Sequence, residues 1–204
     1  MISCILLSAG LSKRFGSPKA LAKINGQTVI EHVQSTFIRS EVEQIIIVLG
    51  DRAEHIKPHI LNHRKIKLVY NKDYNLGQTS SFQIGLAAVS PSATGIMLQP
   101  VDAPLIKPQT IDLIVRQFQR ILPDILIPTY NGHKGHPPIF HTRKKITLMT
   151  LSHNTGLNQF EHDHQAGTRL MSVEDPGIIY SFNTRREFRE IQRQFKINRQ
   201  VWFI

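Results

Sequence analysis

Short apolar runs alternate with stretches of helical periodicity along most of the chain. Ile2–Ser8 and Gln44–Leu49 are nearly continuous apolar runs, as expected for strands that are buried on both faces of a sheet. We predict further strands at 67–70, 95–99 and 124–128, and helices at 28–40, 52–61, 79–89, 107–121, 139–162 and 185–197. Strands that alternate with helices of ten or more residues predict parallel strands joined by crossovers. The fold class is therefore α/β, a three-layer α/β/α sandwich with a mostly parallel sheet.

Length and composition are typical of one globular domain. The 204 residues include 41% hydrophobic residues and one cysteine, Cys4, which excludes an internal disulfide. We therefore expect a single domain over 1–204 that works in the cytoplasm. No apolar run reaches the length of a membrane span, and no signal peptide is recognised, so no membrane association is expected.

The formal net charge of +10 favours anionic ligands. Basic residues recur at helical spacing near the C-terminus, at Arg185, Arg189, Arg193 and Lys196. We interpret them as a solvated helix face, and we do not expect nucleic acid as a partner, although a basic helix can bind it. The apolar end at 201–204 is expected to pack on the domain or on a second subunit, which leaves monomer and homodimer open.

The segment that follows the first strand carries the most informative motif. Gly10 and Gly16 bracket a loop that holds Lys13 and Arg14, and Lys19 follows three positions later. Such a loop exposes backbone N–H groups and fixed positive charge, as a triphosphate requires. It is neither a Walker A loop nor a Gly-x-Gly-x-x-Gly fingerprint.

A second candidate residue lies at the end of another predicted strand. Asp102 follows the run at 95–99 and stands between two prolines. In parallel sheets ligands bind beyond the carboxyl ends of the strands, so we expect Asp102 and the glycine-bracketed loop to meet there. A carboxylate at this position is a Mg²⁺ ligand, or else an Asx turn or cap before the helix at 107–121.

The loop resembles the signature of a known enzyme family. The matching positions are Leu7, Ala9, Gly10, Ser12, Arg14, Gly16 and Lys19. They are similar to the signature of the Rossmann-like nucleotidyltransferases, and within these to the molybdenum-cofactor branch, which attaches CMP or GMP to molybdopterin. The resemblance implies a Mg²⁺-dependent nucleotidyltransferase of EC class 2.7.7. It also implies that these loop residues bind the nucleotide, with Arg14 and Lys19 as catalytic cations.

Three further segments resemble motifs of the same family. The segment 77–81, with Ser80 and Ser81, is similar to the family's nucleotide-binding Gly-Met-x-x-Ser-Leu, although both serines can equally be helix caps. Asp102-Ala103-Pro104 matches the family's Asp-x-Pro, which makes Asp102 the implied Mg²⁺ ligand. Gly135, His136 and Pro137, in a polar loop at 129–138, match the Gly-His-Pro segment on the acceptor side.

The chain departs from the family near residue 183. Members commonly show Asp-x-Asp-Thr-Pro-Glu-Asp, and this chain has Ser181, Asn183 and then Arg185-Arg186-Glu187. Asn183 is left as a neutral candidate metal ligand, which weakens metal binding. Thr184 and Glu187 still predict a capping box for the last helix.

The implied partners are an NTP, CTP or GTP, and a phosphorylated small-molecule acceptor, with a molybdoenzyme or chaperone receiving the product. Leu-Ser-Ala-Gly at 7–10 is nearer the Leu-Ala-Ala-Gly of cytidylyl enzymes, which favours CTP. Two alternatives remain open. One is a transferase for a sugar phosphate or another small molecule, and the other is a nucleotide-binding homologue that no longer turns over.

Overall fold

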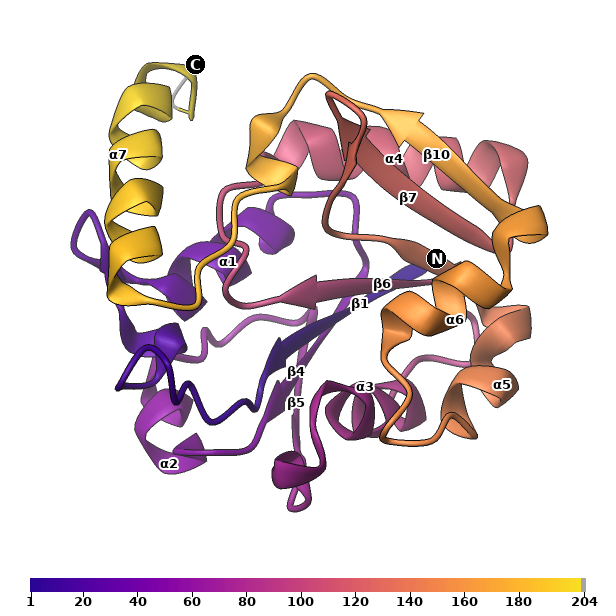
Figure 1. Cartoon of the computed structure of the whole chain (residues 1–204), viewed down its shortest axis with the longest axis horizontal. Helices are drawn as coiled ribbons and strands as arrows, with labels where there is room; N and C mark the ends of the chain where they lie inside the picture. The colour runs from indigo at the N-terminus through magenta and orange to yellow at the C-terminus, as the bar shows by residue number, and fades with distance from the viewer. Residues whose placement is uncertain (203–204) are drawn as a thin grey trace.

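A mixed but mostly parallel sheet forms the centre of the molecule (Figure 1). The computed structural model describes residues 1–202, and side chains through Lys196. The eight strands of the main sheet in these residues are β1 (Ile2–Ser8), β4 (Gln44–Leu49), β5 (Ile66–Tyr70), β6 (Gly95–Pro100), β7 (Ile125–Tyr130), β8 (His133–Lys134), β9 (Ile139–His141) and β10 (Thr168–Ser172). Their order is β10-β7-β9-β6-β1-β4-β5, with β8 paired to β7, and β2 (Lys23–Ile24) and β3 (Gln27–Thr28) form a separate hairpin.

Helices cover both faces of this sheet. The α-helices of the described residues are α1 (Val29–Ile38), α2 (Ala53–Ile56), α3 (Gln78–Ala87), α4 (Pro108–Ile121), α5 (Lys145–Met149), α6 (Leu157–Asp163) and α7 (Arg185–Trp202). One core cluster contains side chains of α1, α4 and α7, and the other contains side chains of α3, α5 and α6. The predicted three-layer α/β/α class is confirmed.

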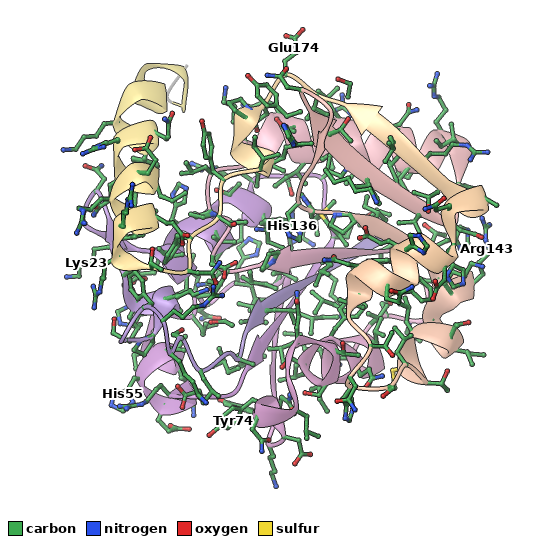
Figure 2. All side chains as sticks on the ribbon, viewed as in Figure 1. Lys23, His55, Tyr74, His136, Arg143 and Glu174 are labelled. Carbon is green, nitrogen blue, oxygen red and sulfur yellow. The ribbon has the colours of Figure 1, made fainter. Side chains whose placement is uncertain are left out.

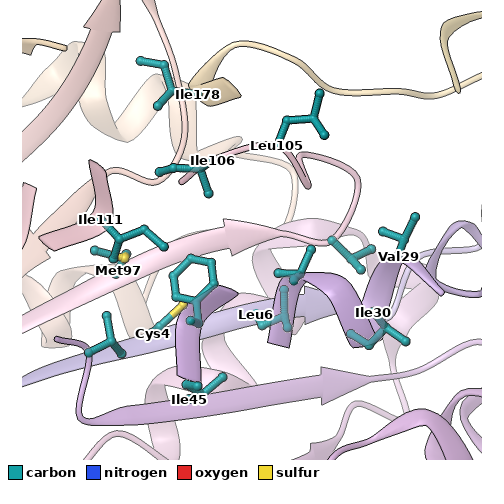
Figure 3. Close-up of a cluster of buried hydrophobic side chains, with 14 of the residues drawn as sticks. Cys4, Leu6, Val29, Ile30, Ile45, Met97, Leu105, Ile106, Ile111 and Ile178 are labelled. Atoms are coloured by element: carbon teal, nitrogen blue, oxygen red, sulfur yellow. The ribbon is translucent and has the colours of Figure 1, made fainter. Parts of the chain in front are cut away.

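Alternation along the central strands explains the two clusters. In β1, Cys4 and Leu6 join the cluster under α1 and α4, whereas Ile5 and Leu7 join the cluster under α3. Successive side chains of a strand point to opposite faces, so a continuous apolar run fills both cores. Figure 3 shows Cys4 and Leu6 in one cluster with Ile30 of α1.

The predicted helix over 139–162 is wrong. Ile139–His141 form β9, which lies antiparallel between β6 and β7, and only α5 and α6 are α-helical in this region. A strand of three residues shows no periodicity that separates it from a short buried helix segment. The expected polar loop at 129–138 also contains a strand, β8, which pairs antiparallel with β7.

The helix predicted at 52–61 is shorter than expected. α2 ends at Ile56 and a 3₁₀ turn follows at Lys57–His59. Pro58 has no N–H group to continue the α-helical hydrogen bonds.

The last helix, α7, begins at Arg185 and lies at one side of the molecule (Figure 1). Phe188, Ile191 and Phe195 are buried, while Arg189, Arg193 and Lys196 are exposed, so the solvated basic face is confirmed for these three residues. The predicted packing of 201–204 lies outside the described side chains. None of the helices described here combines the length and the apolar character that a bilayer crossing requires.

Candidate functional site

The signature loop returns to the end of β1 through a tight turn. The Ser12 carbonyl accepts hydrogen bonds from the N–H groups of Phe15 and Gly16, both at 3.0 Å. Gly16 has φ +79°, a left-handed conformation that glycine adopts without strain. Ser12 Oγ accepts a hydrogen bond from the Lys19 backbone N–H at 3.2 Å. The loop therefore places the start of the Lys19 side chain beside the carboxyl end of β1.

Three side chains from distant segments meet at this edge, and we call Lys19, Asp102 and Asn183 the cation corner. Lys19 Nζ donates to Asp102 Oδ2 at 2.6 Å and to Asn183 Oδ1 at 2.8 Å. The Lys19 and Asp102 side chains are 13% and 24% exposed, so water screens their attraction only in part. The predicted meeting of the glycine-bracketed loop with Asp102 is confirmed.

The backbone that follows β6 positions Asn183 beside Asp102. The Phe182 N–H donates to the Asp102 carbonyl at 3.1 Å, which brings the next residue, Asn183, to the carboxylate. Thr184 and Glu187 form the predicted capping box, with bonds of 2.9 and 3.3 Å. Asp102 does not cap α4, because Asp175 Oδ2 accepts the Lys107 N–H at 2.9 Å. The Asp102 carboxylate is thus left to the corner.

An aromatic cluster ties the loop to the start of α7. The Phe15 ring lies 5.3 Å from Phe182 and 5.6 Å from Phe188. The Arg185 guanidinium lies 4.3 Å over the Phe15 ring, donates to the Phe15 carbonyl at 3.1 Å and donates to Ser17 Oγ at 2.8 Å. Arg185 is exposed, as expected for the solvated face, but its additional contact with the loop was not predicted from the sequence. Sequence spacing carries no signal for a contact made across 170 residues.

A cavity of about 390 Å³ opens beside the cation corner. The predicted site residues that line it are Leu7, Ala9, Gly10, Ser12, Lys19, Ser81, Asp102, His136 and Asn183. The predicted residues outside its lining are Arg14, Gly16, Ser80, Gly135 and Pro137. Tyr74, Asn75 and Gln78 also line the cavity and were not predicted (Tyr74 is labelled in Figure 2).

Arg14 lies apart from Lys19. Its side chain is exposed, and its positive charge acts on Glu187 at the start of α7. Hydrogen bonds from the Asn183 and Thr184 N–H groups lower the pKa of Glu187, and the charge of Arg14 adds a smaller contribution. The structure therefore brings one of the two predicted cations, Lys19, into the cavity.

The two serines of α3 are hydrogen-bonded within the protein. Asn71 Nδ2 donates to Ser80 Oγ and to Ser81 Oγ, each at 3.0 Å. Ser80 Oγ also lies 2.9 Å from the Gly77 carbonyl oxygen, at the start of the helix. Gly77 has φ +101°, where a side chain would be strained. This geometry is that of a helix-start network, and only Ser81 reaches the cavity wall.

His136 belongs to the segment predicted to meet the acceptor. Its backbone N–H donates to the Ile178 carbonyl at 2.8 Å, and His136 is one of the residues that line the cavity (His136 is labelled in Figure 2). A Cβ on Gly135 would lie 2.6 Å from that same carbonyl oxygen, so glycine is required there. Burial lowers the pKa of His136, while the Asp102 charge opposes the shift. Nδ1 of His136 is buried with no hydrogen-bond partner in the described chain.

The corner fits a magnesium ion only in company with a substrate. Within residues 1–196 no group of three or more His, Cys, Asp or Glu side chains is placed to hold a metal. Mg²⁺ commonly takes one or two carboxylates and completes its octahedron with phosphate oxygens and water. The Asp102 carboxylate and the Asn183 carboxamide oxygen suit that kind of site.

Comparison with known proteins identifies the family. The model of the MobA-like NTP transferase domain matches residues 4–168. The chain belongs to this family. The matched region includes the signature loop, Asp102 and His136, whereas Asn183 and α7 lie beyond it.

Similar proteins cover nearly the whole chain. A probable molybdenum cofactor guanylyltransferase of Bacillus cereus (strain AH187) is 24% identical over 195 residues, which are 93% of this chain and 94% of that protein. The molybdenum cofactor cytidylyltransferase of Escherichia coli (strain K12) is 25% identical over 192 residues, 92% and 93% of the two chains. The crystal structure of Rv0371c from Mycobacterium tuberculosis H37Rv has a TM-score of 0.83 and 25% identity, covering 94% of this chain and 97% of that one. The predicted family resemblance is confirmed.

Proposed function

We propose that this MobA-like domain transfers a nucleoside monophosphate from CTP or GTP to the phosphate of a molybdopterin acceptor. An acceptor oxygen forms a bond to the α-phosphorus, the bond from that phosphorus to the bridging oxygen breaks, and pyrophosphate leaves. The single observation that carries the proposal is the cation corner, since Lys19 and Asp102 meet at one wall of the cavity. Relatives named as molybdenum cofactor guanylyl- and cytidylyltransferases support the choice of acceptor.

The proposed chemistry assigns separate tasks to the residues of the corner. Lys19 binds the triphosphate and stabilises the charge that develops on the phosphoryl oxygens. Asp102 and Asn183 would hold Mg²⁺, which supplies Lewis-acid charge when bound. The backbone of Gly10–Ser12 lines the cavity beside Lys19 and is the proposed support for the phosphates.

His136 is proposed to contact the acceptor. His136 lines the cavity together with Asp102, and burial favours the neutral imidazole by lowering the pKa of His136. A neutral imidazole donates one hydrogen bond and accepts another, which suits a polar acceptor. Gly135 and Pro137 shape the segment and stay predicted acceptor-site residues.

CTP is the favoured nucleotide in this proposal. Ala9 lines the cavity and packs against Gly50, where an added Cβ would lie 2.9 Å from the Ala9 Cβ. The support for CTP is the Leu-Ser-Ala-Gly sequence at 7–10, which is nearer the Leu-Ala-Ala-Gly of cytidylyl enzymes. We place the reaction in the cytoplasm, because the one cysteine, Cys4, leaves no internal disulfide to maintain.

Pyrophosphate release tests the reaction directly. The protein is incubated with molybdopterin, Mg²⁺ and each NTP in turn, and CTP is expected to give the fastest release. Omitting molybdopterin or the metal should stop it. Equal rates without molybdopterin, or turnover only with a sugar phosphate, would replace the proposed acceptor, and faster release with GTP would reverse the proposed nucleotide preference.

A second candidate function is nucleotide binding without turnover. It is favoured by Asn183, which contributes no negative charge to the corner. In that case the parent protein binds NTP and releases no pyrophosphate, while Asn183→Asp creates release. Release by the parent protein excludes this candidate.

A further inference from the structure

The Lys19 ammonium donates hydrogen bonds to both of the oxygens that are proposed to hold the metal. Nζ is 2.6 Å from Asp102 Oδ2 and 2.8 Å from Asn183 Oδ1. We propose that Lys19 and a divalent cation compete for these two oxygens, so that the metal binds only when a triphosphate draws the ammonium away. This inference rests on the proposed nucleotide site. It adds that the nucleotide binds before the metal, and that Asn183 determines this order.

The charges of the corner make the competition exclusive. Asp102 contributes one negative charge, Lys19 one positive charge and Asn183 none, so the three side chains sum to zero. In the part of the chain whose side chains are described, no group of three or more His, Cys, Asp or Glu side chains is placed to hold a metal. A divalent ion sharing one carboxylate with an ammonium meets like-charge repulsion without a second carboxylate to offset it.

Packing holds the ammonium at these oxygens. Lys19 Nζ lies 5.9 Å from the centroid of the Phe182 ring, within the range of a cation–π contact, and Phe182 is fully buried. The Lys19 backbone is fixed by Ser12 Oγ. The pair is therefore more confined than an exposed surface ion pair, in which both side chains move freely.

A triphosphate can reverse this arrangement. It carries several negative charges and offers the ammonium new oxygen acceptors, and the flexible Lys19 stem can follow them. Once Nζ leaves, Asp102 Oδ2 and Asn183 Oδ1 are free to accept the metal that neutralises the same phosphates. Metal and nucleotide then bind with positive coupling, each favouring the other.

Asn183 decides whether the metal needs the nucleotide. Asp at this position would give the corner a net charge of −1 while Lys19 is present. Asn183→Asp is therefore expected to bind a divalent ion without nucleotide. Lys19→Met removes the competing ammonium and also leaves the corner with a net charge of −1, so it should have the same effect.

The test measures metal binding and needs no catalysis. Free Mn²⁺ is followed by electron paramagnetic resonance during titration into each protein in the absence of nucleotide. Asn183→Asp and Lys19→Met are each expected to bind Mn²⁺ at least about tenfold more tightly than the parent. Asn25→Asp is the matched control, since it makes the same charge change at an exposed turn outside the cavity lining and should leave Mn²⁺ binding unchanged.

Two results would overturn the inference. One is parent protein that binds Mn²⁺ without nucleotide as tightly as Asn183→Asp, and the other is unchanged affinity in both folded variants. Each variant tests the competition independently, and circular dichroism identifies one that fails to fold. Adding CTP or GTP to the parent separates the two proposals, because failure to bind Mn²⁺ with either nucleotide counts against the proposed function and leaves the nucleotide-free comparison intact.

Discussion

The two walls of the cavity are held together in opposite ways. The cation corner joins Lys19 to Asp102 and Asn183, which are 83 and 164 residues away along the chain. The start of α3, at Gly77–Ser81, is held by Asn71, which bonds to serines 9 and 10 residues away. One wall is made of long-range ionic contacts, and the other of a local hydrogen-bond network.

The difference separates groups that can exchange partners from groups that cannot. An ammonium on a carboxylate can move to a phosphate, because both partners are anionic oxygens. The Ser80 hydroxyl is buried and bonded to Asn71 and to the backbone, and breaking those bonds costs stability. The corner is therefore the responsive wall, and the α3 start is the fixed one.

The largest effect is expected at Lys19. Lys19→Ala removes the basic side chain that we assign to the phosphates and should lower pyrophosphate release by about 100- to 1,000-fold. Lys13→Ala is the matched control, because Lys13 is an exposed lysine of the same loop. Steady-state rates of pyrophosphate release compare the two variants. An equal loss of activity in both would contradict a specific role of Lys19 in phosphate binding.

A smaller effect is expected at Arg185, which contacts the loop that leads to Lys19. Arg185→Ala removes the stack on Phe15 and the bond to Ser17, so the loop loses order and nucleotide affinity falls by about tenfold. Arg185→Lys keeps the charge without the planar fork and should recover little. Calorimetric titration compares both with Arg189→Ala, an exposed residue of the same helix. Weakening by Arg189→Ala to the same degree would indicate a general charge effect.

At the start of α3, we expect a substitution to lower stability and to leave nucleotide affinity nearly unchanged. Ser80→Ala should lower the free energy of unfolding by about 1 kcal/mol, because it removes one partner of Asn71. Nucleotide affinity should stay within about twofold, since Ser80 does not line the cavity. Urea unfolding and nucleotide titration of one preparation provide both values. A large loss of affinity with unchanged stability would assign Ser80 to the ligand.

The smallest effect concerns pH. Burial lowers the pKa of His136 below its ordinary value of 6.5, so the unfolded chain takes up a proton before the folded chain does. Stability should therefore fall as pH drops below 6.5, and His136→Gln should reduce that fall. Urea unfolding at pH 7.5 and 5.5 measures it, with the exposed His133→Gln as control. An unchanged pH dependence in His136→Gln would contradict the buried neutral imidazole.

The central sheet could be predicted because its strands are buried on both faces. The runs at β1, β4 and β6 are long and apolar, and their pattern leaves one interpretation. β10 was not predicted because it is an edge strand in which Arg169 and Leu170 are exposed. Its pattern has neither a continuous apolar run nor a clear alternation.

The site could be predicted only where strand ends determine position. Lys19 and Asp102 follow β1 and β6, neighbouring parallel strands, so their meeting follows from topology. Tyr74, which lines the cavity, and Arg185, which contacts the loop, each begin a helical segment, and their positions depend on the course of the preceding chain, which no periodicity encodes. Arg14 is one residue from the buried Phe15, and its direction depends on how that ring packs, which the sequence does not specify.

The three residues of the cation corner are far apart in the sequence, so the corner forms only in a chain that extends at least to Asn183. The matched MobA-like region ends at residue 168, although Asn183 and the Phe188 side chain of the aromatic cluster come later. A fragment cut at that boundary would retain every described strand of the main sheet except β10, of which only Thr168 would remain, and it would lack one of the two oxygens that accept hydrogen bonds from Lys19. The proposed chemistry therefore depends on a residue that is synthesised only after all the described strands of the central sheet.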